Sequence, residues 1–275
     1  MDTYATEGLV KPDCRLPERT MQRMRTLADQ TLAATTGLPP ESIVCPYLPG
    51  WNGLPEDITA EWLSIAGTPA VVDCVASVLG PDIILWGGQF FCKPAHTGLE
   101  VPWHQDGKYW PIAPLQTCSV WLAIDDVTRE NGCMRYIPGS HKTGELFPHR
   151  HDERDDLVLN QVTEEAYFDA GIARNDELRA GEFSLHDVFL VHGSQPNRSD
   201  KRRAAYVLRF MPASSLWDRT TDKQSGSAHY QTHFSTRPIY LMRGAAGANT
   251  ELIYRHPRYA SVSYTHLTLP TKRIV

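Results

Sequence analysis

A histidine and an aspartate stand two positions apart in the stretch VPWHQDGKYW, at His104 and Asp106. Residues i and i+2 of a β-strand point to the same face, so we expect the imidazole and the carboxylate to project together. Such a pair is either a structural salt bridge or two ligands of a divalent metal ion. In a chain with 11 histidines the spacing alone is weak evidence, and the pair needs further partners.

A third ligand is available at His192, which ends the predicted apolar strand of DVFLVHGS. Two histidines and one carboxylate form the facial triad of non-haem Fe(II) oxygenases, which leaves positions on the metal open for a cosubstrate and oxygen. His186 is an alternative third ligand, because it lies six residues earlier with the same strand parity. We expect four other histidines to be surface or loop residues: His96, His141, His149 and His151.

An arginine lies on the next predicted strand after the third ligand. Arg203 begins the next predicted strand, eleven residues after His192. Its planar guanidinium can hold both oxygens of a carboxylate, which suits the distal end of a dicarboxylate cosubstrate. Arg209 has the same strand parity as Arg203 and is the main alternative.

The elements that must position these residues change in character near residue 81. Residues 16–34 carry apolar side chains at helical spacing, and residues 69–79 form a second predicted helix between Thr68 as N-cap and Gly80. A Pro/Gly-rich loop is predicted between them, over residues 37–55. Short strands are predicted over residues 82–93, 117–126, 133–140, 187–194 and 203–211.

Many short strands without alternating helices favour an antiparallel sandwich or barrel. Asn131-Gly132 predicts a hairpin between two of these strands. Residues 142–179 are charged and poorly periodic, which is typical of a functional lid-like insertion or of a solvated surface insertion.

Composition excludes several classes of function. The net charge of −5 offers neither a basic surface for nucleic acid nor a polybasic membrane anchor. No N-terminal leader and no apolar run of bilayer length is apparent. The six scattered cysteines favour neither a disulfide framework nor a zinc-thiolate site. We expect a cytoplasmic monomer or homodimer that acts on a small-molecule substrate, without nucleic-acid or membrane partners.

The C-terminal residues 262–275 have an unusual origin in one interpretation. Val262 to Thr271 resemble the translation of a sequencing-library adapter, so we leave this tail out of the fold prediction. The alternative is an ordinary C-terminal strand, since valine, tyrosine, threonine and leucine suit one.

Several blocks in order and spacing resemble one family: QFFCKP, HQD, YWPI, VWLAIDD, NGCMRYIPGSH and HGSQPNRS followed by RRAAY. Together they resemble the phytanoyl-CoA dioxygenase family of Fe(II)/2-oxoglutarate-dependent oxygenases. The resemblance implies a mainly β fold, with a helical N-terminal region and a double-stranded β-helix core of the jelly-roll, cupin-like kind. It implies a single domain over residues 1–261, with a mostly helical part at 1–80, a β-helix core at 81–215 and a lid-like insertion at 142–180.

The resemblance also implies roles for individual residues. His104, Asp106 and His192 match the iron ligands, and Arg203 matches the arginine that pairs with the distal carboxylate of 2-oxoglutarate. Three further residues match positions that line the cosubstrate pocket: Gln89, Trp121 and Ser194. The alternatives are that Trp121 is a plain core residue and that Gln89 only satisfies a buried backbone group.

The implied activity uses Fe(II), 2-oxoglutarate and O2 to hydroxylate an unactivated C–H bond of a small metabolite, with release of succinate and carbon dioxide. Related halogenating enzymes carry a small residue in place of the carboxylate ligand, so Asp106 favours hydroxylation. The alternative is a cupin-like metal-binding protein without oxygenase activity. Such a protein would have no reason to keep Arg203 and Ser194 beside the triad.

Overall fold

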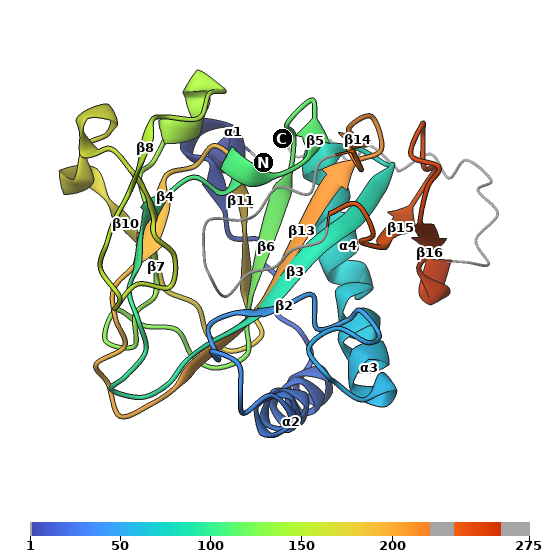
Figure 1. Ribbon diagram of the computed structural model, residues 1–275, viewed down its shortest axis with the longest axis horizontal. Coiled ribbons are helices and arrows are strands. Elements are labelled where there is room, and N and C mark those ends of the chain that lie inside the picture. The colour runs from blue at the N-terminus through green and yellow to red at the C-terminus, as the bar shows by residue number, and fades with distance from the viewer. Residues whose placement is uncertain (1, 221–233, 260–275) are drawn as a thin grey trace, which may run out of the picture.

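The computed structural model describes residues 2–220 and 234–259, and two sheets form its core (Figure 1). The larger sheet runs in the order β1 (Leu9–Val10), β11 (Phe183–Asp187), β6 (Cys118–Ala123), β13 (Arg203–Pro212), β3 (Ile83–Lys93), β15 (Ile239–Arg243) and β16 (Ile253–Arg255), with β2 (Ile43–Val44) paired to β3. The smaller sheet runs in the order β10 (Arg174–Asp176), β7 (Met134–Tyr136), β12 (His192–Ser194) and β4 (Val101–His104). Two sheets of this kind match the predicted jelly-roll core.

Shorter elements complete the described chain. Two further strand pairs are β5 (Ile112–Ala113) with β14 (Leu216–Trp217), and β8 (His149–His151) with β9 (Gln161–Thr163). The α-helices are α1 (Asp2–Glu7), α2 (Glu18–Ala34), α3 (Glu56–Ala66) and α4 (Pro69–Leu79). The 3-10 helices are η1 (Asp106–Tyr109), η2 (Ser140–Thr143), η3 (Glu165–Tyr167), η4 (Ala170–Ile172) and η5 (Pro257–Tyr259).

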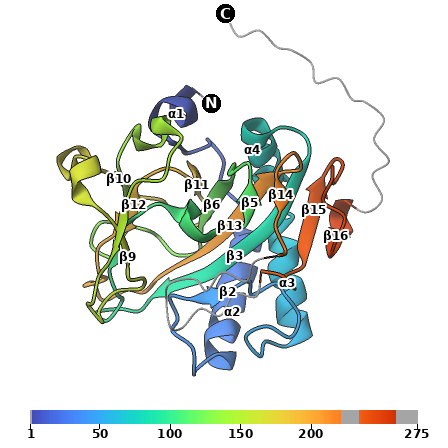
Figure 2. The same ribbon diagram turned by 45° about the horizontal axis from the view of Figure 1, so that its top comes forward.

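The helices α2, α3 and α4 cover one face of the larger sheet (Figures 1 and 2). Along β13 the side chains alternate between the two faces, as the period of a strand requires. Those facing the helices belong to the main apolar core: Ala204, Tyr206, Leu208 and Phe210. Those on the other face line a pocket, described below, or belong to a small buried apolar cluster beside it: Arg203, Ala205, Val207 and Arg209.

The alternation on β3 is interrupted by a β-bulge. Arg209 of β13 is paired with Gly87, but the next residue, Phe210, is paired with Leu85, which leaves Trp86 as an extra residue. A bulge places two consecutive residues opposite one partner. As a result, both Trp86 and Gly87 line the pocket, although neighbours on a regular strand would face opposite sides.

The predicted helices and most of the predicted strands agree with the structure. The helix predicted over 69–79 is α4, and Gly80 follows it with φ +94°, a conformation that glycine adopts at low cost. Thr68 does not cap this helix with its side chain, because its hydroxyl donates to the carbonyl oxygen of Ile65 at 2.7 Å. The predicted loop 37–55 contains the short strand β2.

The predicted hairpin at Asn131-Gly132 is wrong. Strand β6 pairs with β11 and β13, whereas β7 pairs with β10 and β12, so this turn carries the chain from one sheet to the other. The turn itself is real. Gly132 donates to the carbonyl oxygen of Arg129 at 3.2 Å, and the Asn131 side chain bonds to the backbone of Asp126 and Thr128 at 2.8 Å each.

The single strand predicted over 187–194 is also wrong. Strand β11 ends at Asp187, whose carboxylate accepts the backbone N–H of Phe189 at 2.9 Å and so turns the chain. Strand β12 then begins at His192, so this histidine opens a strand instead of ending one. His186 and His192 therefore lie on strands of different sheets.

The region 142–180 is partly built into the core. Its last strand, β10, forms the edge of the smaller sheet, while β8 and β9 form a separate two-stranded pair. The suspected adapter tail at 262–275 lies outside the described residues. Within the described ranges no single helix is long and apolar enough to cross a membrane; α3 and α4 pass that test only as a pair bent by 53°.

Candidate metal centre and pocket

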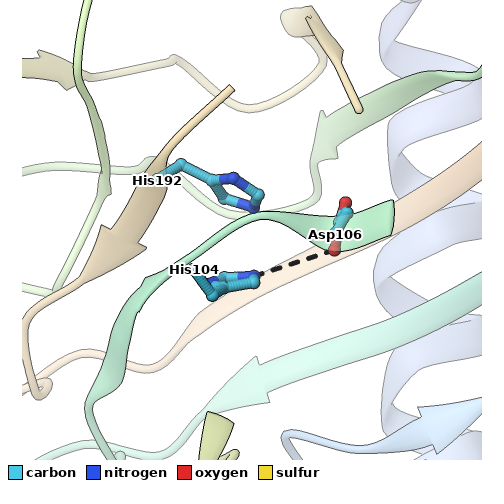
Figure 3. Close-up of side chains that lie close together, drawn as sticks. All are labelled: His104, Asp106 and His192. Carbon is cyan, nitrogen blue, oxygen red and sulfur yellow. Dashed lines mark ion pairs between the residues drawn. The ribbon is translucent and has the colours of Figure 1, made fainter. Parts of the chain in front are cut away.

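The three predicted metal ligands come together at the ends of three elements (Figure 3). His104 is the last residue of β4, Asp106 the first of η1, and His192 the first of β12, where it pairs directly with His104. One ligand atom from each residue lies within 4.8 Å of the other two. Asp106 is not on the strand with His104, contrary to the sequence-based expectation. The chain turns into the 3-10 helix after Gln105 and still brings the carboxylate to 3.7 Å from His104 Nε2.

Backbone carbonyl groups orient both imidazoles. His104 Nδ1 lies 2.9 Å from the carbonyl oxygen of Pro102, and His192 Nδ1 lies 2.9 Å from that of Leu190. A carbonyl oxygen only accepts, so each Nδ1 carries a hydrogen, and in the neutral imidazole the lone pair is then on Nε2. Two neutral imidazoles with free Nε2 atoms beside a carboxylate fit a divalent metal ion.

Electrostatics favour the protonation states that metal binding needs. Burial alone would raise the pKa of Asp106, but the neighbouring side chains of Arg209, His104 and His186 hold that pKa well below its usual range. Burial, reinforced by His104, holds the pKa of His192 well below its usual range. The carboxyl group is therefore ionised and the imidazole neutral at physiological pH.

His186, the alternative ligand, contacts the carboxylate from the other side. Its Nε2 lies 3.6 Å from Asp106 Oδ2, and its ring centroid lies 4.9 Å from that of His192. It is almost fully buried and comes from β11 in the larger sheet. Ser119 donates to the same Oδ2 at 3.4 Å. Ser119 thus donates to the carboxylate oxygen that His104 does not contact, and His186 lies beside that oxygen.

All four predicted cosubstrate residues line the pocket that contains the triad: Gln89, Trp121, Ser194 and Arg203. The pocket encloses about 230 Å³. Arg203 is deeply buried between the rings of Phe91 and Trp121, with its guanidinium carbon 5.1 Å from each ring centroid. Its Nη2 donates to the carbonyl oxygen of Gly132 at 2.8 Å, whereas its Nε has no hydrogen-bond partner among the described residues.

The other predicted pocket residues have mixed environments. Trp121 belongs to a small buried apolar cluster, as its alternative expected, and its ring also contacts the Arg203 guanidinium. Gln89 donates to the carbonyl oxygen of Glu41 at 2.6 Å, which is the structural role considered as its alternative. Ser194 accepts a hydrogen bond from Lys93 at 2.7 Å. Burial lowers the pKa of Arg203 to about 10, so its guanidinium stays charged at neutral pH.

Three residues of this region were left without a role, misjudged or missed from the sequence. Lys93 is fully buried and donates to Ser194 and to the carbonyl oxygen of Gln195; its strand parity with Gln89 was the available signal. His149 was expected at the surface, but it lines the pocket, and its Nε2 accepts from the backbone N–H of Gln105 at 3.4 Å. Arg237 enters the pocket from a segment with no recognisable motif.

Residues 52–205 match the family model described as phytanoyl-CoA dioxygenase (PhyH). The chain belongs to this family. It is 33% identical over 157 residues to a phytanoyl-CoA dioxygenase domain-containing protein 1 homolog of Dictyostelium discoideum, which covers 56% of each chain. It is 29% identical over 155 residues to a probable alpha-ketoglutarate-dependent hypophosphite dioxygenase of Stutzerimonas stutzeri, covering 55% of this chain and 53% of the relative. The chain thus spans about half the length of these curated relatives.

A solved structure resembles most of this chain. The non-heme monooxygenase ThoJ, in its apo form, is 25% identical, with a TM-score of 0.68 over 94% of this chain and 88% of that chain. The family and the fold class predicted from the sequence motifs are both confirmed.

Proposed function

We propose that this phytanoyl-CoA dioxygenase family member is an Fe(II)- and 2-oxoglutarate-dependent dioxygenase that hydroxylates a C–H bond of a small molecule and releases succinate and carbon dioxide. The observation that carries the proposal is the triad of His104, Asp106 and His192 in one pocket with a buried, charged Arg203. The relative named for alpha-ketoglutarate dependence and the structure named as a non-heme monooxygenase support the same chemistry.

His104, Asp106 and His192 would hold Fe(II). Bound there, the metal would supply oxygen activation coupled to oxidative decarboxylation of the 2-oxo acid. The protein's own part is to select, through the carbonyl contacts, the tautomer of both histidines with the lone pair on Nε2, and to keep Asp106 ionised through Arg209.

Arg203 would bind the distal carboxylate of 2-oxoglutarate. Two aromatic rings and the carbonyl oxygen of Gly132 fix the guanidinium in position before any ligand arrives, and Nε is left to donate to the carboxylate. Ser194 has its hydroxyl fixed as an acceptor from Lys93, so its hydrogen is available for a second bond to the cosubstrate. The alternative, a cupin-like protein that binds metal without oxygenase activity, leaves this arginine and serine pair without a use.

The test is an anaerobic titration of Fe(II) and 2-oxoglutarate into the metal-free protein, followed by the visible charge-transfer band of the chelate. We expect a band that saturates near one equivalent and that disappears in Asp106→Ala. A folded protein that gives no band would favour the cupin-like alternative. Succinate release in a substrate screen then tests the oxygenase step.

A further inference from the structure

The pocket contains more positive charge than the proposed chemistry uses. Among the described residues that line it, Asp106 is the only carboxylate, and the cationic side chains are Lys108, Arg203, Arg209 and Arg237. In the proposed chemistry Arg203 pairs with the distal carboxylate of 2-oxoglutarate, and Arg209 Nη2 lies 3.7 Å from Asp106 Oδ1. Among the described residues, Arg237 forms no ion pair, and the only carboxylate that lines the pocket is already beside Arg209.

Arg237 is the least explained of these cations. It is 2% exposed, and neither Nε nor Nη2 finds a hydrogen-bond partner among the described residues. Its guanidinium carbon lies 4.9 Å from the ring centroid of Phe234, 5.4 Å from that of Trp51 and 5.9 Å from that of Trp217. Aromatic faces attract a cation but accept none of its hydrogens in the strong bonds that a carboxylate or phosphate provides. Burial of such a group without an acceptor is costly.

The backbone of Arg237 is also held in place by hydrogen bonds from Arg219. Arg219 donates to the carbonyl oxygens of Ser235 at 3.1 Å and of Arg237 at 2.9 Å. The side chain is therefore directed into the pocket from a fixed segment, and not from a chain that could turn it outward at no cost.

Arg209 shares the same space. A Cβ atom placed on Gly87 would lie 3.7 Å from Arg209 Cβ and 3.8 Å from Arg237 Nη1, so both arginines pack over the side-chain-free surface of Gly87. Arg209 Nε has no hydrogen-bond partner among the described residues either, and its Nη2 lies 3.7 Å from Asp106 Oδ1. The two guanidinium groups therefore extend from the metal centre toward the aromatic end of the pocket, where Trp86 and Trp110 lie.

We propose that Arg237, together with Arg209, binds an anionic group of the substrate, a carboxylate or a phosphate monoester carried on an apolar body. The proposal rests on the proposed function, because it assigns the substrate class of that same site. The unpartnered N–H groups supply the hydrogen bonds to the anion, and the aromatic walls contact the apolar body.

The test is calorimetric titration of the full-length chain, without added metal, with cinnamate, phenyl phosphate and methyl cinnamate. We expect at least one of the two anions to bind at least tenfold more tightly than the neutral ester, and the tighter anion identifies the group. Arg237→Met should weaken binding of that anion at least tenfold and leave the affinity for the ester unchanged. Equal binding of the ester and both anions would overturn the proposal.

Two arginine variants serve as controls. Arg243→Met removes the same charge from the same part of the chain, where Arg243 pairs with Asp73 at 2.9 Å outside the pocket, and should change the affinity less than twofold. Arg203→Met should leave anion binding intact; loss of binding in this variant but not in Arg237→Met would mean that the probe occupies the cosubstrate site, and would overturn the assignment.

Thermal unfolding separates a binding role from a structural one. An arginine with unsatisfied buried N–H groups lowers the stability of the free protein, so Arg237→Met should melt at the same or a higher temperature without ligand. A lower melting temperature would make Arg237 structural and contradict the proposal. If this variant does not fold, Arg209→Met provides the same binding measurement. None of these titrations uses Fe(II), 2-oxoglutarate or oxygen. The anion can therefore fail to bind although the chelate band appears, and the anion can bind although the chelate band is missing.

Discussion

The two faces of the larger sheet differ although the same strands form both. On the helix side, alternate residues of β13 such as Tyr206 and Phe210 pack into an apolar core. On the pocket side, the intervening residues Arg203 and Arg209, with His186 from β11, keep buried nitrogen atoms that have no hydrogen-bond partner among the described residues. One face therefore supplies stability, and the other holds polar groups in readiness for ligands at the expense of stability.

The largest effect on the pocket face should come from removal of the Asp106 carboxylate. Asp106→Ala should abolish succinate formation, because the triad loses its only anionic ligand, and should lower the melting temperature of the metal-free protein, because Arg209 loses its carboxylate partner. Succinate assays and thermal unfolding of the purified variant measure both. Asp73→Ala, at an exposed carboxylate that pairs with Arg243, is the matched control and should keep full activity. Substantial turnover by Asp106→Ala would refute the ligand assignment.

The converse substitution lies on the helix side. Trp62 is fully buried, packs against Phe90 and Tyr206, and donates to Thr31 Oγ1 at 2.9 Å. Trp62→Ala should lower the free energy of unfolding by about 3–5 kcal/mol through the cavity it leaves. Urea denaturation measures this loss.

Trp110→Ala, at a half-buried tryptophan on the pocket side, is the matched control and should cost less. The folded fraction of Trp62→Ala should still give the chelate band. Loss of the band with the fold intact would show that the two faces are not independent.

A smaller effect should come from Arg203→Lys. The charge remains, but the planar fork that would hold both oxygens of the distal carboxylate is lost, so the KM for 2-oxoglutarate should rise about tenfold, or about 1.4 kcal/mol. Steady-state kinetics at saturating substrate measure it. Arg202→Lys is the control on the opposite face, where Arg202 pairs with Asp29 and Asp125. A higher KM for 2-oxoglutarate in Arg209→Lys but not in Arg203→Lys would show that Arg209 binds the cosubstrate.

The smallest expected effect concerns His149 at the edge of the pocket. Burial lowers its pKa to about 4, and Lys108 and His104 add to the shift. An unfolded histidine titrates near 6.5. Between about pH 6.5 and pH 4 the unfolded chain therefore binds a proton that the folded protein does not, and stability falls as the pH is lowered.

Urea midpoints at pH 7 and pH 5 test this expectation. His149→Gln should lose less stability over that interval than the parent protein. Other buried histidines, such as His192 and His256, are common to both proteins and cancel in the comparison. Equal losses in the two proteins would show that His149 is not held in its neutral form.

The sequence predicted what depends on local spacing. The alternation of residues 203–211 and the end of α4 at Gly80 follow from strand period and glycine conformation, and the positions of the triad follow from motif spacing. The run DVFLVHGS could not be divided correctly, because its break depends on the turn at Asp187 and on the sheet that each half joins.

Residues brought in from distant segments were equally inaccessible. Arg237 and His149 reach the pocket through tertiary packing, and nothing in their local sequence marks them. The roles of the individual site residues, the domain boundaries and the origin of the tail stay predictions.

The bulge at Trp86 divides β3 into two parts that differ in which alternate residues face the pocket side of the sheet. Beyond it, Gln89, Phe91 and Lys93 face the end of the pocket where Arg203 and Ser194 lie; before it, Ile84 and Trp86 belong to the aromatic end. A one-residue insertion or deletion before the bulge would exchange the faces of the residues on that side and leave the residues near Arg203 and Ser194 in register. The strand can therefore evolve a new specificity at one end while its other end keeps the same chemistry.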